Sequence, residues 1–353
     1  MAVADERSPL ELTTTRLRPL WVGAAVVAVA AALVGGVLVG PVEISLGAIA
    51  RSALEKLPLT DIGTRLPATE DAIVWELRMP RVVLAALVGG MLAVAGAAYQ
   101  GVFRNPLADP YLLGVAAGAG LGATTAIAYG PPGIAGSRLL PLAAFAGAVA
   151  AVLLTYGIGR SLGGERTSAT LILAGVTVAA FLTSIQTFAQ QQNTETLNEV
   201  YAWLLGGLST AGWRDVTMVL PYVAVSIVAL VLYRRTMDVY AVGDEEARSL
   251  GLDVGRTRAV IVAAATLGTA AAVSVSGLIA FVGIIVPHLV RLAISPSYRV
   301  IVPLSVALGA AFLVLADVVA RTALAPAELP IGVVTAFVGG PFFALVLRST
   351  RSW

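Results

Sequence analysis

The chain has 353 residues, of which 58% are hydrophobic and only 12% are charged. Because a soluble domain carries about 25% charged residues, this composition excludes a soluble globular protein and indicates an integral membrane protein. The formal net charge of +2 is too small to argue for a nucleic-acid partner, and the absence of cysteine excludes disulfides and thiolate metal sites.

Apolar segments follow one another along most of the chain. Only helices and closed barrels span lipid, and these runs do not alternate as barrel strands do. The sequence therefore predicts an all-α, polytopic membrane protein of ten transmembrane helices. The predicted spans are 20–40, 82–103, 111–129, 139–159, 169–190, 215–233, 259–275, 277–290, 300–320 and 331–347. The first span lacks a cleavage-site pattern after it, so we expect it to be retained.

The positions of the basic residues predict the orientation of these spans. With the N-terminus inside the cell, most of the 23 basic residues fall on inner segments, as the positive-inside rule requires. We therefore expect a cytoplasmic tail over residues 1–19, a membrane domain over 20–348, and both termini in the cytoplasm.

Two inner segments carry distinctive polar patterns. The connection after the second span reads Arg104-Asn105-Pro106-Leu107-Ala108-Asp109-Pro110, a more specific turn than two buried helices need. The longest inner connection, 234–258, contains a segment from Gly243 to Leu252 that predicts a short amphipathic helix stopped by glycine. This helix could contact a cytoplasmic partner, although a solvated linker helix explains the pattern equally well.

Small residues also recur at helical spacing. Gly114, Gly118 and Gly122 lie on one helical face, and such spacing lets helices approach closely in lipid. Packing within one subunit is the more economical interpretation, and a contact between subunits is the alternative.

The chain lacks the residues of an enzyme. It has no Gly-x4-Gly-Lys-Ser/Thr loop for ATP, and its single histidine, His288, has no cysteine or second histidine with which to hold a metal. The predicted spans contain almost no ionisable residues, the clear exception being Asp317 with Arg321 one helical turn later. The missing proton relay argues against a secondary transporter, which remains the alternative from a different functional class.

Several blocks, occurring in order over residues 76–347, resemble a known family. They are Glu76-Leu77-Arg78-Met79-Pro80-Arg81, Gly96-Ala97-Ala98-Tyr99-Gln100, Asn105-Pro106-Leu107-Ala108-Asp109-Pro110, Trp203-Leu204-Leu205-Gly206-Gly207, Pro287-His288-Leu289-Val290-Arg291, Ala316-Asp317 and Glu328-Leu329-Pro330-Ile331-Gly332. With them the chain closely resembles the FecCD/BtuC-type permeases, the membrane subunits of ABC importers for ferric siderophores, haem and vitamin B12. The first 75 residues carry no comparable motif.

This resemblance implies an assembly as well as a fold. We expect a homodimer in the cytoplasmic membrane of a bacterium, two ABC ATPase subunits that bind ATP and magnesium, and an extracytoplasmic substrate-binding protein. No cofactor is expected on this chain. The expected cargo is a ferric siderophore, the commonest cargo of this family, with cobalamin or haem as alternatives. Selection among them is expected to rest mostly with the binding protein.

The resemblance also implies three sets of site residues. Contact with the ATPase is expected at Gly243, Asp244, Glu245, Glu246, Ala247, Leu250 and Gly251, with Glu246 in place of the first alanine of the family's coupling motif. Docking of the binding protein is expected at Arg78, Arg81 and Arg321, although interface anchoring, or pairing of Arg321 with Asp317, would also explain these arginines. A cytoplasmic gate is expected at Asn105, Leu107, Thr167 and Ser168, and helix capping is the competing role for the last two.

Overall fold

The computed structural model describes residues 16–40, 42, 44–55, 67–131, 133, 137–161 and 168–350. These residues form helices joined by turns and contain no β-strand. The all-α prediction is therefore confirmed.

Each predicted span corresponds to one helix. These helices are α1 (Pro19–Leu38), α4 (Met79–Phe103), α5 (Val115–Tyr129), α6 (Leu139–Ser161), α7 (Ser168–Gln192), α9 (Trp213–Tyr240), α11 (Val254–Ser276), α12 (Val282–Ala293), α13 (Tyr298–Thr322) and α14 (Ile331–Thr350). Among the described residues, seven helices are long and apolar enough to cross a membrane, while α5, α12 and the apolar part of α14 are shorter.

Two predicted spans begin too early. The third was expected from residue 111, but α5 begins at Val115, after Gly114 with φ of 83°. The eighth was expected from residue 277, but Gly277 has φ of 67° and helix α12 begins only at Val282. Both errors have one cause: apolar residues fill the turns as well as the helices, so hydropathy does not mark where a buried turn ends.

Short helices lie between the long ones. They are α2 (Leu46–Glu55), α3 (Ala68–Ala72), the π-helical turn η1 (Ile73–Arg78) that leads into α4, the 3-10 turn η3 (Thr194–Thr196), α8 (Leu197–Leu204) and α10 (Asp244–Ser249). Helix α10 confirms the predicted short helix in the segment 234–258. It stops before Gly251, whose φ of 85° suits glycine because other residues rarely adopt it.

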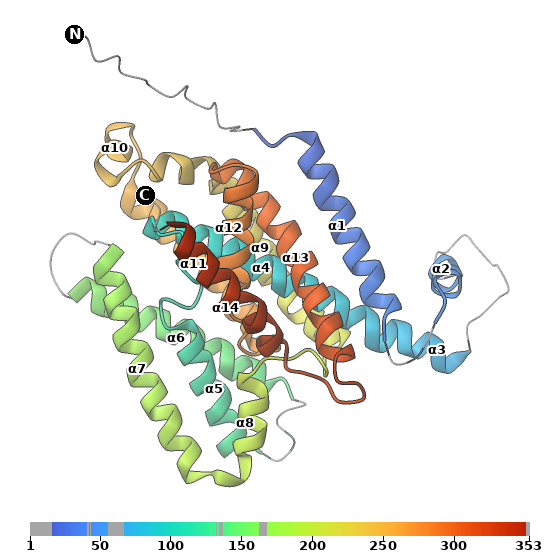
Figure 1. Cartoon of the computed structure of the whole chain (residues 1–353). Helices are drawn as coiled ribbons and strands as arrows, with labels where there is room; N and C mark the ends of the chain where they lie inside the picture. Colours follow the sequence, from blue (N-terminus) through green and yellow to red (C-terminus); the bar gives the residue numbers. More distant parts are fainter. Residues whose placement is uncertain are drawn as a thin grey trace.

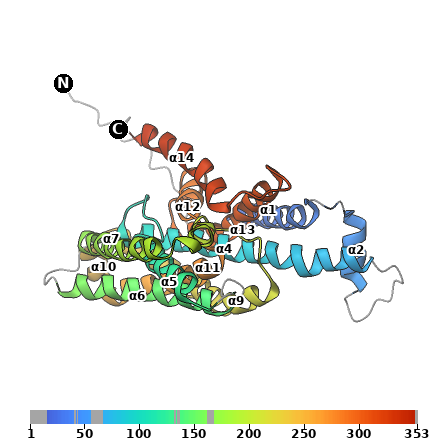
Figure 2. The same ribbon diagram turned by 90° about the horizontal axis from the view of Figure 1, so that it is seen from below.

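Helix α4 runs through the middle of the bundle, with α9, α11, α12 and α13 packed around it (Figure 1; Figure 2). Small residues make the close approaches. A Cβ on Gly96 of α4 would lie 1.9 Å from the carbonyl oxygen of Gly283 in α12. Close contact between backbones is typical of helices that associate in lipid.

Helices α5, α6 and α7 form a second group beside the first (Figure 1). A Cβ on Gly118 would lie 2.2 Å from the carbonyl oxygen of Gly147, and one on Gly122 would lie 2.2 Å from that of Ala143. The glycines at helical spacing in α5 therefore serve packing against α6 within one subunit.

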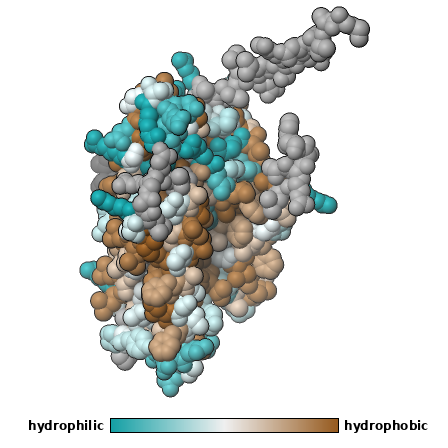
Figure 3. All heavy atoms as spheres, turned by 90° about the vertical axis from the view of Figure 1, so that its left-hand side faces the viewer, coloured by the Kyte–Doolittle hydropathy of each residue, from teal (hydrophilic) through white to brown (hydrophobic). Residues whose placement is uncertain are grey.

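The surface is divided by hydropathy. Figure 3 shows a hydrophobic band across the middle of the molecule, with hydrophilic residues at both ends. Large apolar side chains on this surface include Phe181 and Phe188 of α7, each 63% exposed, and Leu153 of α6, 66% exposed. Such a band is typical of a protein whose sides contact lipid or another membrane subunit.

Candidate functional site

Helix α10 is held at its first residue by two arginines. Asp244 accepts a hydrogen bond from Nη2 of Arg104, at the end of α4, and another at 2.9 Å from Nη2 of Arg258 in α11. Arg258 is buried and also donates from Nε to the hydroxyl of Tyr240 at 2.8 Å. One carboxylate thus joins the ends of three helices, α4, α10 and α11.

The aromatic ring of Tyr240 contacts the guanidinium groups of both arginines. The guanidinium carbons of Arg104 and Arg258 each lie 5.7 Å from the ring centroid, within the range of a cation–π contact. Tyr240 packs with Ala247 and Val254 in a small separate core, which fixes α10 against α9 and α11.

The predicted ATPase-contact residues divide into buried and exposed groups. Gly243 and Ala247 are buried, and Gly243 has φ of 138°, so their roles in this structure are conformational and packing roles. Glu245, Glu246 and Leu250 point outward, and Leu250 is 69% exposed. These exposed side chains, on α10 and on the residue that follows it, are the ones that a partner could touch.

A cleft lies beside α10 and the adjacent helix ends. Its volume is about 840 Å³, and its lining includes Phe103 and Arg104 of α4, Tyr156 of α6, Leu171 of α7 and residues 242–246. The connection after α4 and the helix expected to contact the ATPase therefore border the same space.

The connection from Arg104 to Gly114, which we call the gate turn, is held by hydrogen bonds to its own side chains. Arg104 has φ of 50°, Asn105 Oδ1 accepts from the amide of Leu107 at 2.9 Å, and Asp109 Oδ1 accepts from the amide of Tyr111 at 2.7 Å. Such side-chain-to-backbone bonds replace helical hydrogen bonds in turns. Burial raises the pKa of Asp109 to about 6, although the bond from the Tyr111 amide opposes this shift.

The gate turn also contacts the segment before α12. The hydroxyl of Tyr111 donates to the carbonyl oxygen of Ile279 at 2.9 Å and accepts from its amide at 3.1 Å. Of the predicted gate residues, Asn105 and Leu107 thus lie on a well-defined turn. Thr167 and the side chain of Ser168 lie outside the described residues, so the gate remains a prediction.

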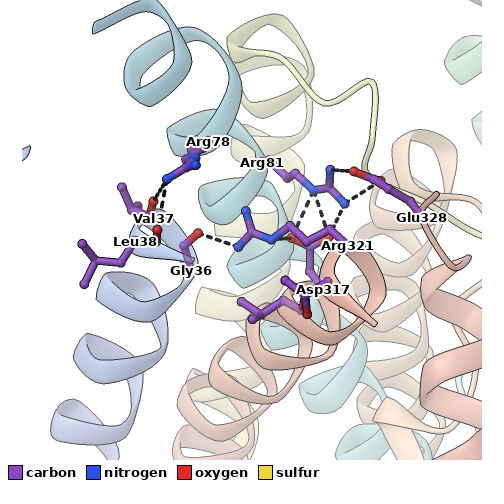
Figure 4. Close-up of polar contacts among 10 residues, drawn as sticks. Gly36, Val37, Leu38, Arg78, Arg81, Asp317, Arg321 and Glu328 are labelled. Atoms are coloured by element: carbon purple, nitrogen blue, oxygen red, sulfur yellow. Dashed lines mark hydrogen bonds and ion pairs between the residues drawn. The ribbon is translucent and has the colours of Figure 1, made fainter. Parts of the chain in front are cut away.

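The three arginines expected to dock a binding protein cluster at the opposite end of the bundle (Figure 4). Arg81 binds Asp317 at 2.9 Å through Nη2 and Glu328 at 2.9 Å through Nη1. Nε of Arg321 lies 3.6 Å from Oδ2 of Asp317, so the ion pair considered from the sequence is present.

Two of these arginines also bind backbone carbonyls at the end of α1. Arg78 donates to the carbonyl oxygens of Val37 at 2.9 Å and Leu38 at 3.1 Å, and Arg321 donates to that of Gly36. Arg78 and Arg321 are buried, with 5% of each residue exposed. The carbonyls at a helix C-terminus lack intrahelical partners, so these contacts stabilise the end of α1. The docking role itself remains a prediction.

Sequence reasoning did not assign roles to Arg104, Tyr240, Arg258, Tyr111 or Glu328. Glu328 stands within a block that carried the resemblance, and Arg104 and Tyr111 directly flank another, so these positions were a usable signal. Tyr240 and Arg258 gave no comparable signal, because a tyrosine and an arginine at helix ends are common in membrane proteins.

Comparisons with known proteins agree with this architecture. The model of the FecCD transport family matches residues 21–349. The chain is 40% identical to the cobalamin import system permease protein BtuC of Halobacterium salinarum, over 93% of this chain and 95% of that protein. It is 38% identical to the iron(3+)-hydroxamate import system permease protein FhuB of Bacillus subtilis, over 80% of this chain and 73% of that protein. It is also 38% identical to the vitamin B12 import system permease protein BtuC of Escherichia coli, over 80% of this chain and 85% of that protein.

A solved structure has the same fold. It is described as an inward-facing conformation of a metal-chelate type ABC transporter, and it superposes with a TM-score of 0.82 at 24% identity, covering 94% of this chain and all of that one. This likeness is one of fold. The match over residues 21–349 and the alignments with import system permeases confirm the resemblance found in the sequence: the chain is a multi-pass ABC importer permease and belongs to the FecCD transport family.

Proposed function

We propose that this chain carries cobalamin across a prokaryotic cytoplasmic membrane as one half of a homodimeric permease. The alignment with the Halobacterium salinarum cobalamin permease carries this choice, because it extends over nearly the full length of both chains. The sequence analysis favoured a ferric siderophore, and the hydroxamate permease of Bacillus subtilis keeps this cargo as the second candidate.

In this proposal the chain has no catalytic residues and binds no cofactor. ATP and magnesium bind to two separate ATPase subunits, which sit against α10 at the cytoplasmic end. A substrate-binding protein delivers the cargo at the opposite end, where Arg81 and Glu328 lie. Both termini are cytoplasmic, in agreement with the distribution of basic residues.

The proposed mechanism is alternating access driven by the ATPase. Movement of the ATPase displaces α10, and Asp244 passes this displacement to Arg104 at the start of the gate turn. Because a gate must release its cargo, short and weakly binding side chains such as Asn105 suit the constriction. No bond to the cargo forms or breaks on this chain.

The cargo is tested with the complete importer in proteoliposomes. We expect ATP-dependent uptake of labelled cobalamin in the presence of its binding protein, and no uptake of a ferric hydroxamate or haem. Uptake of the hydroxamate alone would transfer the assignment to the second candidate, and uptake of none would contradict the proposed class of cargo.

The ATPase contact is tested separately with two matched substitutions. Leu250→Arg alters α10, whereas Leu324→Arg, at a residue 58% exposed, lies just after α13 at the opposite end. We expect only Leu250→Arg to prevent copurification of the ATPase. Equal copurification with both variants would show that the exposed part of α10 is not the contact.

A further inference from the structure

A basic pocket lies at the same end of the bundle as α10, yet it takes no part in the proposed transport cycle. It is formed where α1 begins, α9 ends and α13 begins, and its volume is about 650 Å³. The lining residues are Arg16, Leu17, Val231, Arg234, Arg235 and Arg299, together with Pro303. The lining thus combines four arginines with three apolar residues.

Among the residues that the structure describes, few groups compensate the positive charge of this pocket. Arg299 pairs with one neighbouring carboxylate, that of Asp238, at 3.2 Å. Arg234 donates to a backbone carbonyl of its own helix. Arg16 and Arg235 are exposed and form no ion pair within the described ranges. Four guanidinium groups with one carboxylate create a strongly positive potential, which favours an anion.

The pocket stands at the level where the apolar surface of the bundle ends. Leu20 in the first turn of α1 is 73% exposed and Leu232 of α9 is 69% exposed, as expected for side chains that face lipid. Arg16 precedes the first of these residues, and Arg234 and Arg235 follow the second. Basic residues directly beyond a lipid-facing surface lie at the depth of phospholipid headgroups.

We propose that this pocket binds the headgroup of an anionic phospholipid. The guanidinium groups would hold the phosphate, since their planar, forked donors match its oxygens. Leu17, Val231 and Pro303 would contact the glycerol and the first methylenes of the acyl chains. This apolar part of the lining favours a lipid over a soluble anion. The bound lipid would join the start of α1 to α9 and α13.

The test measures lipid retention by the complete importer in detergent. Native mass spectrometry would follow titration with phosphatidylglycerol, with phosphatidylcholine as the uncharged comparison. The wild type should retain phosphatidylglycerol preferentially. Because Arg16 and Arg235 form no ion pair with any residue that the structure describes, the double variant Arg16→Gln, Arg235→Gln should fold. It should bind this lipid about thirtyfold more weakly, given about 1 kcal/mol for each cation near anionic lipid.

A matched variant separates the pocket from general surface charge. Arg160→Gln with Arg256→Gln removes two exposed arginines at the same end of the bundle but outside the pocket. It should retain phosphatidylglycerol as the wild type does. An equal loss in both double variants, or no loss in either, would overturn the proposal. Thermal stabilisation by inorganic phosphate equal to that by phosphatidylglycerol would also overturn it, because the pocket would then be a soluble-anion site.

Discussion

Arg104 and Asp244, 140 residues apart in the chain, form an ion pair that joins the start of the gate turn to the first residue of α10. Because Arg104 is the residue that ends α4 and Asp244 also binds Arg258, the pair couples α10 to both α4 and α11. This relationship makes the proposed transfer of motion from the ATPase to the gate directly testable.

Loss of this ion pair should uncouple ATP hydrolysis from uptake. In Arg104→Gln, we expect the ATPase to remain bound and active, but the cargo imported per ATP should fall about fivefold, corresponding to a coupling of about 1 kcal/mol. Uptake and ATP hydrolysis are measured together in proteoliposomes. A double-mutant cycle with Asp244→Asn should show non-additive effects, and strictly additive losses would contradict a direct link.

The contacts of Arg78 predict a structural role at the end of α1. Arg78→Ala should lower the thermal stability of the purified permease, because burying an unpaired carbonyl costs about 1–3 kcal/mol. Arg138→Ala, at an exposed arginine, is the control and should leave the melting temperature unchanged. Equal melting temperatures for the two variants, with a loss of affinity for the binding protein in Arg78→Ala alone, would contradict the structural role. Arg78 would then serve docking alone.

Glu328 should compete with the binding protein for Arg81. It binds Arg81 through both carboxylate oxygens, and its side chain is 38% exposed, whereas the Asp317 side chain is 1% exposed. An incoming carboxylate could therefore replace Glu328 but not Asp317. On the proposed docking role, Glu328→Gln should bind the binding protein several-fold more tightly in surface plasmon resonance. Weaker or unchanged binding would contradict this exchange.

The approach of α5 to α6 depends on the absence of a side chain. Gly118→Ala should destabilise the permease by about 1–3 kcal/mol, as overpacked cores do, because its Cβ would meet backbone rather than a movable side chain. Gly157→Ala in α6 is the control, since a Cβ there would have no neighbour within 4 Å. Thermal unfolding in detergent should separate the two variants, and equal melting temperatures would contradict this account of the packing.

The raised pKa of Asp109 predicts a pH dependence. Because the ordinary pKa of aspartate is about 4 and the folded-state value is about 6, the folded protein keeps a proton that the unfolded chain has lost between these values. The contribution of protonated Asp109 to the free energy of unfolding is thus fully present below about pH 4. It is lost as the pH rises through about 6. Asp109→Asn keeps the oxygen that accepts from the Tyr111 amide but cannot titrate. The melting temperature of this variant should therefore lack the fall between about pH 4 and about pH 6 that Asp109 causes. Parallel pH profiles for the two proteins would contradict the assignment.

The sequence by itself determined the spans, the short helix α10 and the family. These features depend on local properties, namely hydropathy over a bilayer's length, glycine at a helix end and blocks of residues in order. It could not place the starts of α5 and α12, because buried turns are as apolar as the helices that follow them.

Apart from Asp317 and Arg321, which are one helical turn apart, only the tertiary structure decided which charged groups meet. Arg81 lies 236 residues from Asp317 and 247 from Glu328, and no local pattern relates residues at such separations. The structure likewise brings Arg16, from the segment before α1, to one pocket with Arg235 of α9 and Arg299 of α13, which are distant from it in the chain. Ion pairs and pockets of this kind arise when helices pack, so their partners are fixed by the geometry of the bundle and not by the order of residues.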